Sequence, residues 1–220
     1  MIVRSWPAGA LLALMSLALW LAPGPSLAAD VDLPAPQTEG GMGLFEALKK
    51  RSSVPGGDFS LAEVTLGELS TVLWAASGLN RGQTGWTVPM AEGVAPYVRI
   101  YVAGQEGTFR YDWGGHRLIE VSGENIKARI GGPSFIRKAF YVLILTTDRE
   151  ILGQLVRGGK DRQDEFAQVL AGAMTQDIYL AAAALSLGTR YIHSMNVEAV
   201  RSALGLGPDD YPIALMLLGK

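Results

Sequence analysis

Residues 161–187, DRQDEFAQVLAGAMTQDIYLAAAALSL, decide the fold of this 220-residue chain. The stretch opens with acidic residues, continues as an almost wholly apolar run and stops at Gly188. Acids favour the first turn of a helix and glycine favours its end, so the stretch predicts one long helix. Because a helix this apolar has to be covered, we expect it to be the spine of the core or of a dimer interface.

Other segments carry shorter helix and strand signals. Thr65 and Glu68 form a capping-box pair, and apolar residues follow at helical spacing as far as Gly78. The run AFYVLILTTD (139–148) is continuously apolar, as is typical of a strand buried on both faces in the middle of a sheet. Further strands are expected at 97–103, 108–113, 116–121, 189–192 and 212–218, and further helices near 43–50, 124–130 and 197–204.

The order of these elements predicts the fold class. The runs between residues 97 and 121 alternate apolar and polar residues and are separated by glycine turns, which indicates an antiparallel meander. We therefore expect an α+β sandwich with helices flanking a mixed, mostly antiparallel sheet. The first helix places Leu44, Phe45 and Leu48 on one face.

The N-terminus has the features of a secretory signal peptide. Arg4 precedes an apolar run from Ala8 to Ala22, and small residues stand before the bond after Ala28. We expect cleavage there, with Ala29 as the alternative, and export, with the periplasm as the compartment. An uncleaved membrane anchor is the other interpretation, but the apolar run is shorter than the roughly 20 residues of a spanning helix. The mature chain is therefore expected to have no stable membrane span.

These features divide the chain into a signal peptide (1–28), a leader segment rich in Pro, Gly and acids (29–42) and one domain (43–220). The net charge of −2 leaves no basic footprint for nucleic acid. The chain has no cysteine, which excludes disulfides, a thiol nucleophile and thiolate metal sites. With two histidines in the whole chain, a histidine-rich metal site is excluded as well.

Several segments, in order, resemble the nitroreductase superfamily of FMN-dependent oxidoreductases. They cover nearly all of the chain after residue 43, and the likeness is nearest to the branch that includes azoline-forming dehydrogenases and exported relatives. The matching segments are ALKKRSSV (47–54), LSTVLWAASGLNR (69–81), TVPMAEGVAPYVRIYV (87–102), MTQDIYLAAAALSLGTRYI (174–192) and VRSALGLGPDDYPIALMLLGK (200–220). The resemblance implies an α+β homodimer with FMN bound between the subunits, each FMN contacted by both chains, and a small-molecule substrate.

The family's Arg-rich opening implies that Arg51 and Ser53, with Ser52, bind the phosphate of FMN. A guanidinium can bind phosphate through two parallel hydrogen bonds, so the residue types suit this role. A solvated basic helix end with ordinary loop serines is the alternative. The resemblance also offers Arg81 and Lys220 for the phosphate, although the chain ends where relatives commonly continue.

Two further segments are matched to the flavin ring. Thr87, Pro89 and Met90 correspond to a Thr-x-Pro-Ser-Ala motif that lines the ring in relatives, with Met90 in place of the serine and Glu92 just after it. The thioether of a methionine can pack on the flavin ring, but it cannot form the hydrogen bond to the ring that a serine hydroxyl forms. In the family, the loop after the long helix offers backbone N–H groups to flavin N5, and the matching residues here are Ile192, His193 and Ser194.

Catalytic residues are not identified by the sequence. His193 is a weak candidate for a proton donor, and a loop histidine facing solvent is its alternative. His116 is expected to be an ordinary turn residue. Asp177 replaces the asparagine of the family's Gln-Asn pair, and as a carboxylate in an apolar helix it is expected to need a partner, such as Arg190 or Arg201.

Two functional hypotheses follow from the resemblance. The first is an exported FMN-binding oxidoreductase of the nitroreductase family with an unknown substrate. The second is a non-enzymatic dimer of the same fold, a binding or scaffold protein whose flavin site has eroded, as the departures at Met90, Glu92 and Asp177 suggest. A serine hydrolase is disfavoured because the chain has no Gly-x-Ser-x-Gly motif.

Overall fold

The computed structural model describes residues 29–56, 58–82, 85–89 and 95–220. The expected signal peptide, together with Met90 and Glu92, lies outside these residues. In the described part of the chain, no helix is both long and apolar enough to cross a membrane.

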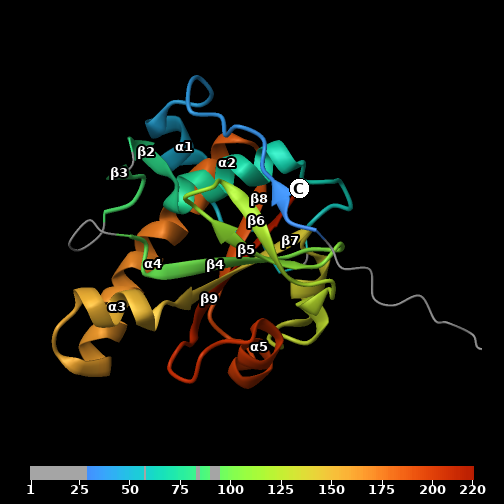
Figure 1. Ribbon diagram of the computed structural model, residues 1–220. Helices are drawn as coiled ribbons and strands as arrows, with labels where there is room; N and C mark the ends of the chain where they lie inside the picture. The colour runs from blue at the N-terminus through green and yellow to red at the C-terminus, as the bar shows by residue number, and fades with distance from the viewer. Residues whose placement is uncertain (1–28, 57, 83–84, 90–94) are drawn as a thin grey trace, which may run out of the picture.

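A sheet of seven strands forms the centre of the described structure, in the order β1-β6-β5-β4-β7-β9-β8 (Figure 1). The strands are β1 (Val31–Asp32), β4 (Val98–Ala103), β5 (Thr108–Asp112), β6 (Arg117–Ser122), β7 (Tyr141–Thr147), β8 (Gly188–Ile192) and β9 (Pro212–Gly219). Each pairing among the described strands of this sheet is antiparallel, so the expected mixed character is not observed. A separate hairpin pairs β2 (Leu79–Arg81) with β3 (Gly85–Trp86).

The helices are α1 (Leu44–Lys50), α2 (Leu66–Ser77), α3 (Arg149–Leu155), α4 (Gly159–Ala184) and α5 (Val197–Leu204), with short 3-10 turns η2 (Ile126–Ala128) and η3 (Ser134–Lys138). In Figure 1, α1 and α2 lie on one side of the sheet and α5 on the other. The helix expected near 124–130 shortens to η2. The helix α3 was not predicted from the local pattern, and it begins at a side-chain cap from Asp148.

Two apolar layers cover the two faces of the sheet. Alternate residues of β7, such as Leu143 and Leu145, pack with α2 and α4, whereas Val142 and Ile144 pack with η2, η3 and α5. This alternation is the period of a strand, and it confirms that the apolar run 139–148 is a strand buried on both faces. In the sheet, β7 lies between β4 and β9.

The long helix α4 confirms the expectation that this stretch is the spine of the core. Its buried side includes Ala167, Leu170, Met174 and Ile178, and it packs against α1, α2, α3 and the edge of the sheet formed by β8 and β9. Its other side carries exposed residues, among them Val169. The helix therefore has one covered face and is not buried all round.

The leader segment packs on its own domain. Its β1 pairs with β6, the side chain of Leu33 is buried, and the Ser70 hydroxyl of α2 donates to the carbonyl of Pro34 at 2.5 Å. The backbone N–H of Gln37 donates to the Thr71 hydroxyl at 3.0 Å. We call residues 37–42 the strap, because they continue from these contacts across one end of α2 and α4 toward α1.

Candidate functional site

Arg51 and Ser53 meet the long helix at one tyrosine. The Arg51 guanidinium carbon lies 5.1 Å from the centre of the Tyr179 ring, and the Ser53 hydroxyl is 2.7 Å from the Tyr179 hydroxyl. The backbone N–H of Tyr191 in β8 donates to the same hydroxyl at 2.8 Å. Arg51 has no carboxylate partner among the described residues, so its charge is available to an anion. Ser52 is exposed beside it.

Chain geometry explains why these residues converge. The helix α1 ends at Lys50 with Arg51 as its C-cap, and the N–H of Val54 then donates to the carbonyl of Thr189 at 3.0 Å. The segment after α1 is thereby held against β8, an edge strand with outward-facing backbone groups. Arg190 reinforces the contact, since its guanidinium donates to the Val54 carbonyl at 2.8 Å.

A cavity of about 450 Å³ lies further along α4, and Tyr191 of β8, whose backbone contacts Tyr179, lines it. It is lined by Gly172 and Thr175 of α4, by Tyr191 and His193 at the end of β8, and by the start of β9. Tyr179 and Gly172 are seven residues apart, which is about 10 Å along a helix. One face of α4 therefore carries two features in line. Arg51 and Ser53 lie at Tyr179, and the cavity lies about two turns away at Gly172.

The predicted ring-binding loop lies at this cavity. The His193 and Tyr191 rings stack with their centres 6.5 Å apart, and the Tyr191 hydroxyl is 3.4 Å from His193 Nδ1. His193 and Ser194 are exposed, whereas Ile192 is buried in the sheet. Residues 193 and 194 therefore lie at the surface, where a ligand can approach their backbone, while the Ile192 side chain anchors the strand.

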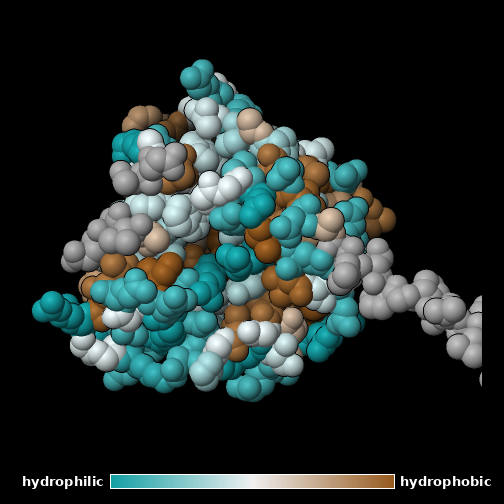
Figure 2. Space-filling view, viewed as in Figure 1, coloured by the Kyte–Doolittle hydropathy of each residue, from teal (hydrophilic) through white to brown (hydrophobic). Residues whose placement is uncertain are grey.

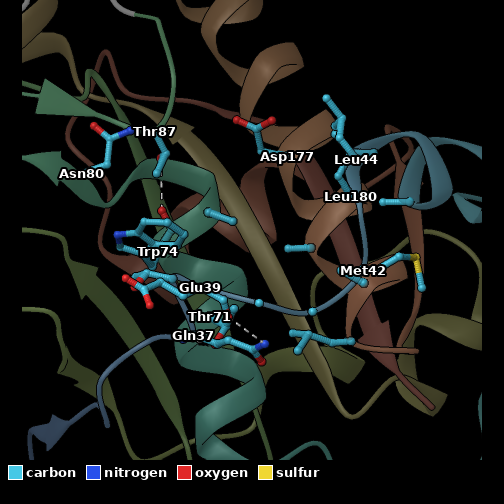
Figure 3. A pocket seen from close by; sticks show the side chains of 18 residues that line it. Gln37, Glu39, Met42, Leu44, Thr71, Trp74, Asn80, Thr87, Asp177 and Leu180 are labelled. Carbon is cyan, nitrogen blue, oxygen red and sulfur yellow. Dashed lines mark hydrogen bonds between the residues drawn. The ribbon is translucent and has the colours of Figure 1, made fainter.

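Thr87 and Arg81 lie elsewhere, on the hairpin that follows α2. The Thr87 hydroxyl donates to the carbonyl of Trp74 at 3.1 Å, and Arg81 donates to the carbonyl of Trp86 at 3.4 Å. Thr87 lines a different cavity, of about 410 Å³, and Pro89 is exposed just after β3. We call this cavity the strap pocket. It is bounded by the strap, α1, α2, the hairpin and the C-terminal half of α4 (Figure 3).

Asp177 of α4 lines the strap pocket, and Figure 3 shows it apart from Glu39 and Trp74. Its expected pairing with Arg190 or Arg201 is wrong. Arg190 binds the Val54 carbonyl and lies over the Phe135 ring, while Arg201 donates to the carbonyls of Gly207, Pro208 and Asp210. Partial burial without a compensating charge raises the pKa of Asp177 to about 6.

Lys220 does not join the Arg51 cluster. Its ammonium lies 2.9 Å from a carboxylate oxygen of Glu68, in the first turn of α2, and its backbone carbonyl accepts the N–H of Ser60. Burial by itself would raise the pKa of Glu68, but the hydrogen bonds from Thr65 and the contact with Lys220 together lower it. Lys220 therefore tethers the end of β9 to α2.

The residues matched to the flavin fall into two groups on opposite sides of α4. Tyr179, at the Arg51 cluster, and Asp177, in the strap pocket with Thr87, are two residues apart, which is about 200° around a helix. One group holds Arg51, Ser53 and His193, and the other holds Thr87. Within one subunit, the two groups therefore face different cavities.

Sequence reasoning missed Tyr179 and Tyr191. Tyr179 is buried, yet its hydroxyl serves as the hydrogen-bonding centre of the cluster. A tyrosine inside an otherwise aliphatic helix is a usable signal, because a buried phenol usually finds a polar partner. Tyr191 follows an arginine in an edge strand and offers no comparable signal.

The comparisons with known proteins agree on one family. The model of the nitroreductase family matches residues 48–220. MJ1384, a protein of Methanocaldococcus jannaschii named as a candidate nitroreductase, is 29% identical over 186 residues, which cover 80% of this chain and 90% of that protein.

Solved structures give the same result. A candidate nitroreductase from Ralstonia eutropha JMP134 matches with a TM-score of 0.80 and 27% identity, over 89% of this chain and 90% of that one. A chain of the Escherichia coli microcin synthetase McbBCD complex, with truncated pro-MccB17 bound, matches with a TM-score of 0.67 and 16% identity, over 77% of this chain and 70% of that one. The second likeness concerns the fold alone. With most of its length matched by the family model and its sheet and helices shared with these structures, the chain belongs to the nitroreductase family.

Proposed function

We propose that this protein is an FMN-binding oxidoreductase that holds the flavin between two copies of the chain. The observation that carries the proposal is the arrangement along one face of α4. Arg51 and Ser53 contact Tyr179, and Tyr191 and His193 of the neighbouring strand line a cavity further along the same helix. Members of this family typically bind FMN, and the donor set suits that ligand.

Arg51, Ser52 and Ser53 would hold the phosphate, which carries a charge of about −2. The guanidinium supplies a charge and paired donors, and the hydroxyls supply further donors. Tyr179 positions both Arg51 and Ser53 through its ring and hydroxyl. The contact of Lys220 with Glu68 removes it from this set, so the phosphate depends mainly on Arg51.

The ring would lie in the cavity beside Tyr191 and His193, within reach of the backbone N–H groups at 193 and 194. FMN, when bound, accepts and returns two electrons as hydride. The chain's own part is to place hydrogen-bond donors at one edge of the ring and to keep a proton-carrying imidazole nearby. His193 is exposed, so it can exchange protons with solvent.

A homodimer is part of the proposal. Thr87 lies across α4 from Arg51, and in the proposed dimer it contacts the flavin that Arg51 of the other subunit holds. Apolar side chains that the described structure leaves exposed support such an interface: Leu44, Phe45 and Leu48 on α1 and Val169 on α4. Figure 2 shows hydrophobic residues at the surface over α1.

We also propose that the protein is exported to the periplasm after cleavage of residues 1–28. The support is the charged start, apolar run and small residues before Ala28. Mass spectrometry of the protein recovered from a periplasmic extract should give an N-terminus at Ala29 or Asp30. Intact Met1 in the membrane fraction would contradict export in soluble form.

The alternative is a non-enzymatic dimer of the same fold with an eroded flavin site. Asp177 favours it, since an unpaired carboxylate in the long helix replaces the family's asparagine. The two hypotheses differ in whether FMN binds.

Visible spectroscopy of the purified protein after FMN addition and desalting tests the proposal. We expect a retained flavin band near the absorption of free FMN, and a loss of about tenfold or more in FMN affinity for Arg51→Ala, the effect of removing one charge-assisted contact. Arg137→Ala, at an exposed arginine of η3, is the matched control and should bind as the wild type does. A wild-type protein that retains no flavin would support the non-enzymatic dimer.

A further inference from the structure

The strap pocket has the size of a small-molecule site, and the proposed flavin site does not use it within one subunit. Its volume is about 410 Å³, which falls in the range of ligand pockets. It lies on the opposite side of α4 from the Arg51 cluster. Its roof is the strap, which turns at Gly40 and Gly41 with φ of 71° and 77°. These left-handed positions favour glycine, and the turn brings both Glu39 and Met42 to the pocket.

The charges in the strap pocket have a single sign. Glu39 from the strap and Asp177 from α4 both line it, and no lysine or arginine is among the described residues of its wall. α1, α2 and the hairpin contribute uncharged described residues, so nothing on those elements neutralises the carboxylates. In the described structure neither carboxylate has an ion-pair partner.

The rest of the wall suits an apolar or aromatic body. Met42, Leu44 and Leu180 lie on one side of the pocket, and Trp74 lies near Glu39 on the other (Figure 3). The Trp74 indole N–H is already satisfied by the carbonyl of Leu79 at 2.8 Å, so the ring has no unmet hydrogen bond. An indole beside a carboxylate, as Trp74 lies beside Glu39, is a favourable environment for an organic cation.

We propose that the strap pocket binds an organic cation with an apolar body, an amine or quaternary ammonium compound, with Glu39 and Asp177 as the charge-recognising groups. The pocket also contains Thr87, which in the proposed dimer faces the flavin of the other subunit. This step rests on the proposed function: the bound cation belongs to the class of substrate that the oxidoreductase accepts. The preference for a cation itself rests on the pocket alone.

Isothermal calorimetry with benzyltrimethylammonium chloride tests this inference. The probe carries a permanent charge, so any pH dependence belongs to the protein. We expect saturable binding at pH 8, at least tenfold tighter than for benzyl alcohol, and weaker binding at pH 5, where Asp177 is largely protonated. Equal affinity for the two probes overturns the inference. Absence of cation binding overturns it as well, and a partner subunit that fills the pocket would give this second result.

Two variants locate the site. Asp177→Asn and Glu39→Gln should each weaken cation binding about tenfold, and Asp177→Asn should also remove most of the pH dependence. Glu165→Gln, an exposed carboxylate of α4 outside the pocket, is the matched control and should bind as the wild type does. If Asp177→Asn unfolds, Glu39→Gln on the exposed strap still decides the matter. Unchanged affinity in Glu39→Gln and in a folded Asp177→Asn overturns the assignment.

Flavin binding separates failure of this inference from failure of the proposed function. Cation binding without FMN retention would support the pocket and reject the oxidoreductase. FMN retention without cation binding would reject the pocket and leave the oxidoreductase standing.

Discussion

At the scale of the residue, single polar groups inside apolar surroundings tie distant segments together. The Tyr179 hydroxyl joins the segment after α1 to β8, and the His116 ring joins α2 and β5 to the leader. His116 was expected to be an ordinary turn residue. It does lie in the turn before β6, with φ of 48°, but its ring is partly buried and bonded at both nitrogens.

The His116 ring has a defined polar environment. Nε2 is 2.7 Å from the Ser70 hydroxyl and 3.3 Å from the Pro34 carbonyl, and Nδ1 is 2.9 Å from the Tyr111 hydroxyl. Because Ser70 donates its proton to Pro34, the neutral ring donates from Nε2 and accepts at Nδ1. Burial lowers the pKa of His116, with the Pro34 contact opposing it in part.

We predict that the His116→Asn variant loses part of the pH dependence of folding stability. A lowered pKa means that the unfolded chain binds more protons than the folded one as pH falls below about 6.5, so His116 makes the wild type less stable at low pH. Asparagine tolerates the positive φ and does not titrate. Urea unfolding at pH 7.5 and pH 5 should show a smaller drop for the variant, together with a loss of about 1 kcal/mol at pH 7.5 from missing hydrogen bonds.

His193→Asn is the matched control for this measurement, because it changes the other histidine of the chain at an exposed position. Its pH dependence should follow the wild type. If His116→Asn falls in stability between the two pH values as steeply as the wild type, the His116 ring is not a source of that dependence.

At the scale of the element, local signals set the boundaries of α2. Thr65 accepts the N–H of Glu68 at 3.2 Å, and Glu68 accepts the N–H of Thr65 at 2.7 Å, so the expected capping box is confirmed. The helix ends at Ser77, with Gly78 as its C-cap. In this chain Glu68 also binds Lys220, so the first turn of α2 is linked to the C-terminus.

We predict that Thr65→Ala destabilises the fold by about 1 kcal/mol, the usual effect of losing an N-cap side chain. Thr65 is exposed, so the change leaves no core cavity. Thr38→Ala, an exposed threonine of the strap, is a suitable reference, and thermal unfolding of the two variants provides the comparison. Equal midpoints in the two variants would show that the capping box contributes nothing to stability.

Where local patterns failed, packing partners explain the failure. The sequence pattern places Leu44, Phe45 and Leu48 on one face of α1, yet Ala47 is the buried residue of this helix and Phe45 is 85% exposed. Periodicity shows that a helix has an apolar face but not which surface covers it. In the proposed dimer, the covering surface belongs to the second copy.

At the scale of the whole molecule, we predict a dimer that Phe45→Ser weakens. Burying one phenylalanine contributes about 1.5–3 kcal/mol, and a symmetric interface contains the residue twice. Sedimentation velocity of the wild type should show a species of twice the chain mass, and Phe45→Ser should shift it toward the monomer at low micromolar concentration. Leu61→Ser, at a fully exposed loop leucine, should leave the dimer unchanged. A wild type that sediments as a monomer would reject the shared flavin site.

Much of the fold follows from local pattern. Three local patterns predict an element to within a few residues of its observed limits. They are the capping box of α2, the apolar run of β7, and the stretch of α4 that begins with acidic residues and stops at a glycine. These patterns work because helix ends and strand faces depend on neighbours in the chain. The resemblance to the family was likewise carried by segments in order along the sequence.

The candidate site depended on contacts across the chain. Arg51 and Tyr179 are far apart in sequence, and only the packing of α1 on α4 brings the guanidinium onto the ring. Asp177 has no arginine beside it because Arg190 and Arg201 bind backbone carbonyls of other segments. Thr87 and Arg51 lie on opposite sides of α4. Arg51 lies at Tyr179 and Thr87 shares a pocket with Asp177, and these two helix residues face different cavities because a helix turns about 100° per residue. Local pattern therefore determined the elements, and tertiary packing decided which side chains share a site.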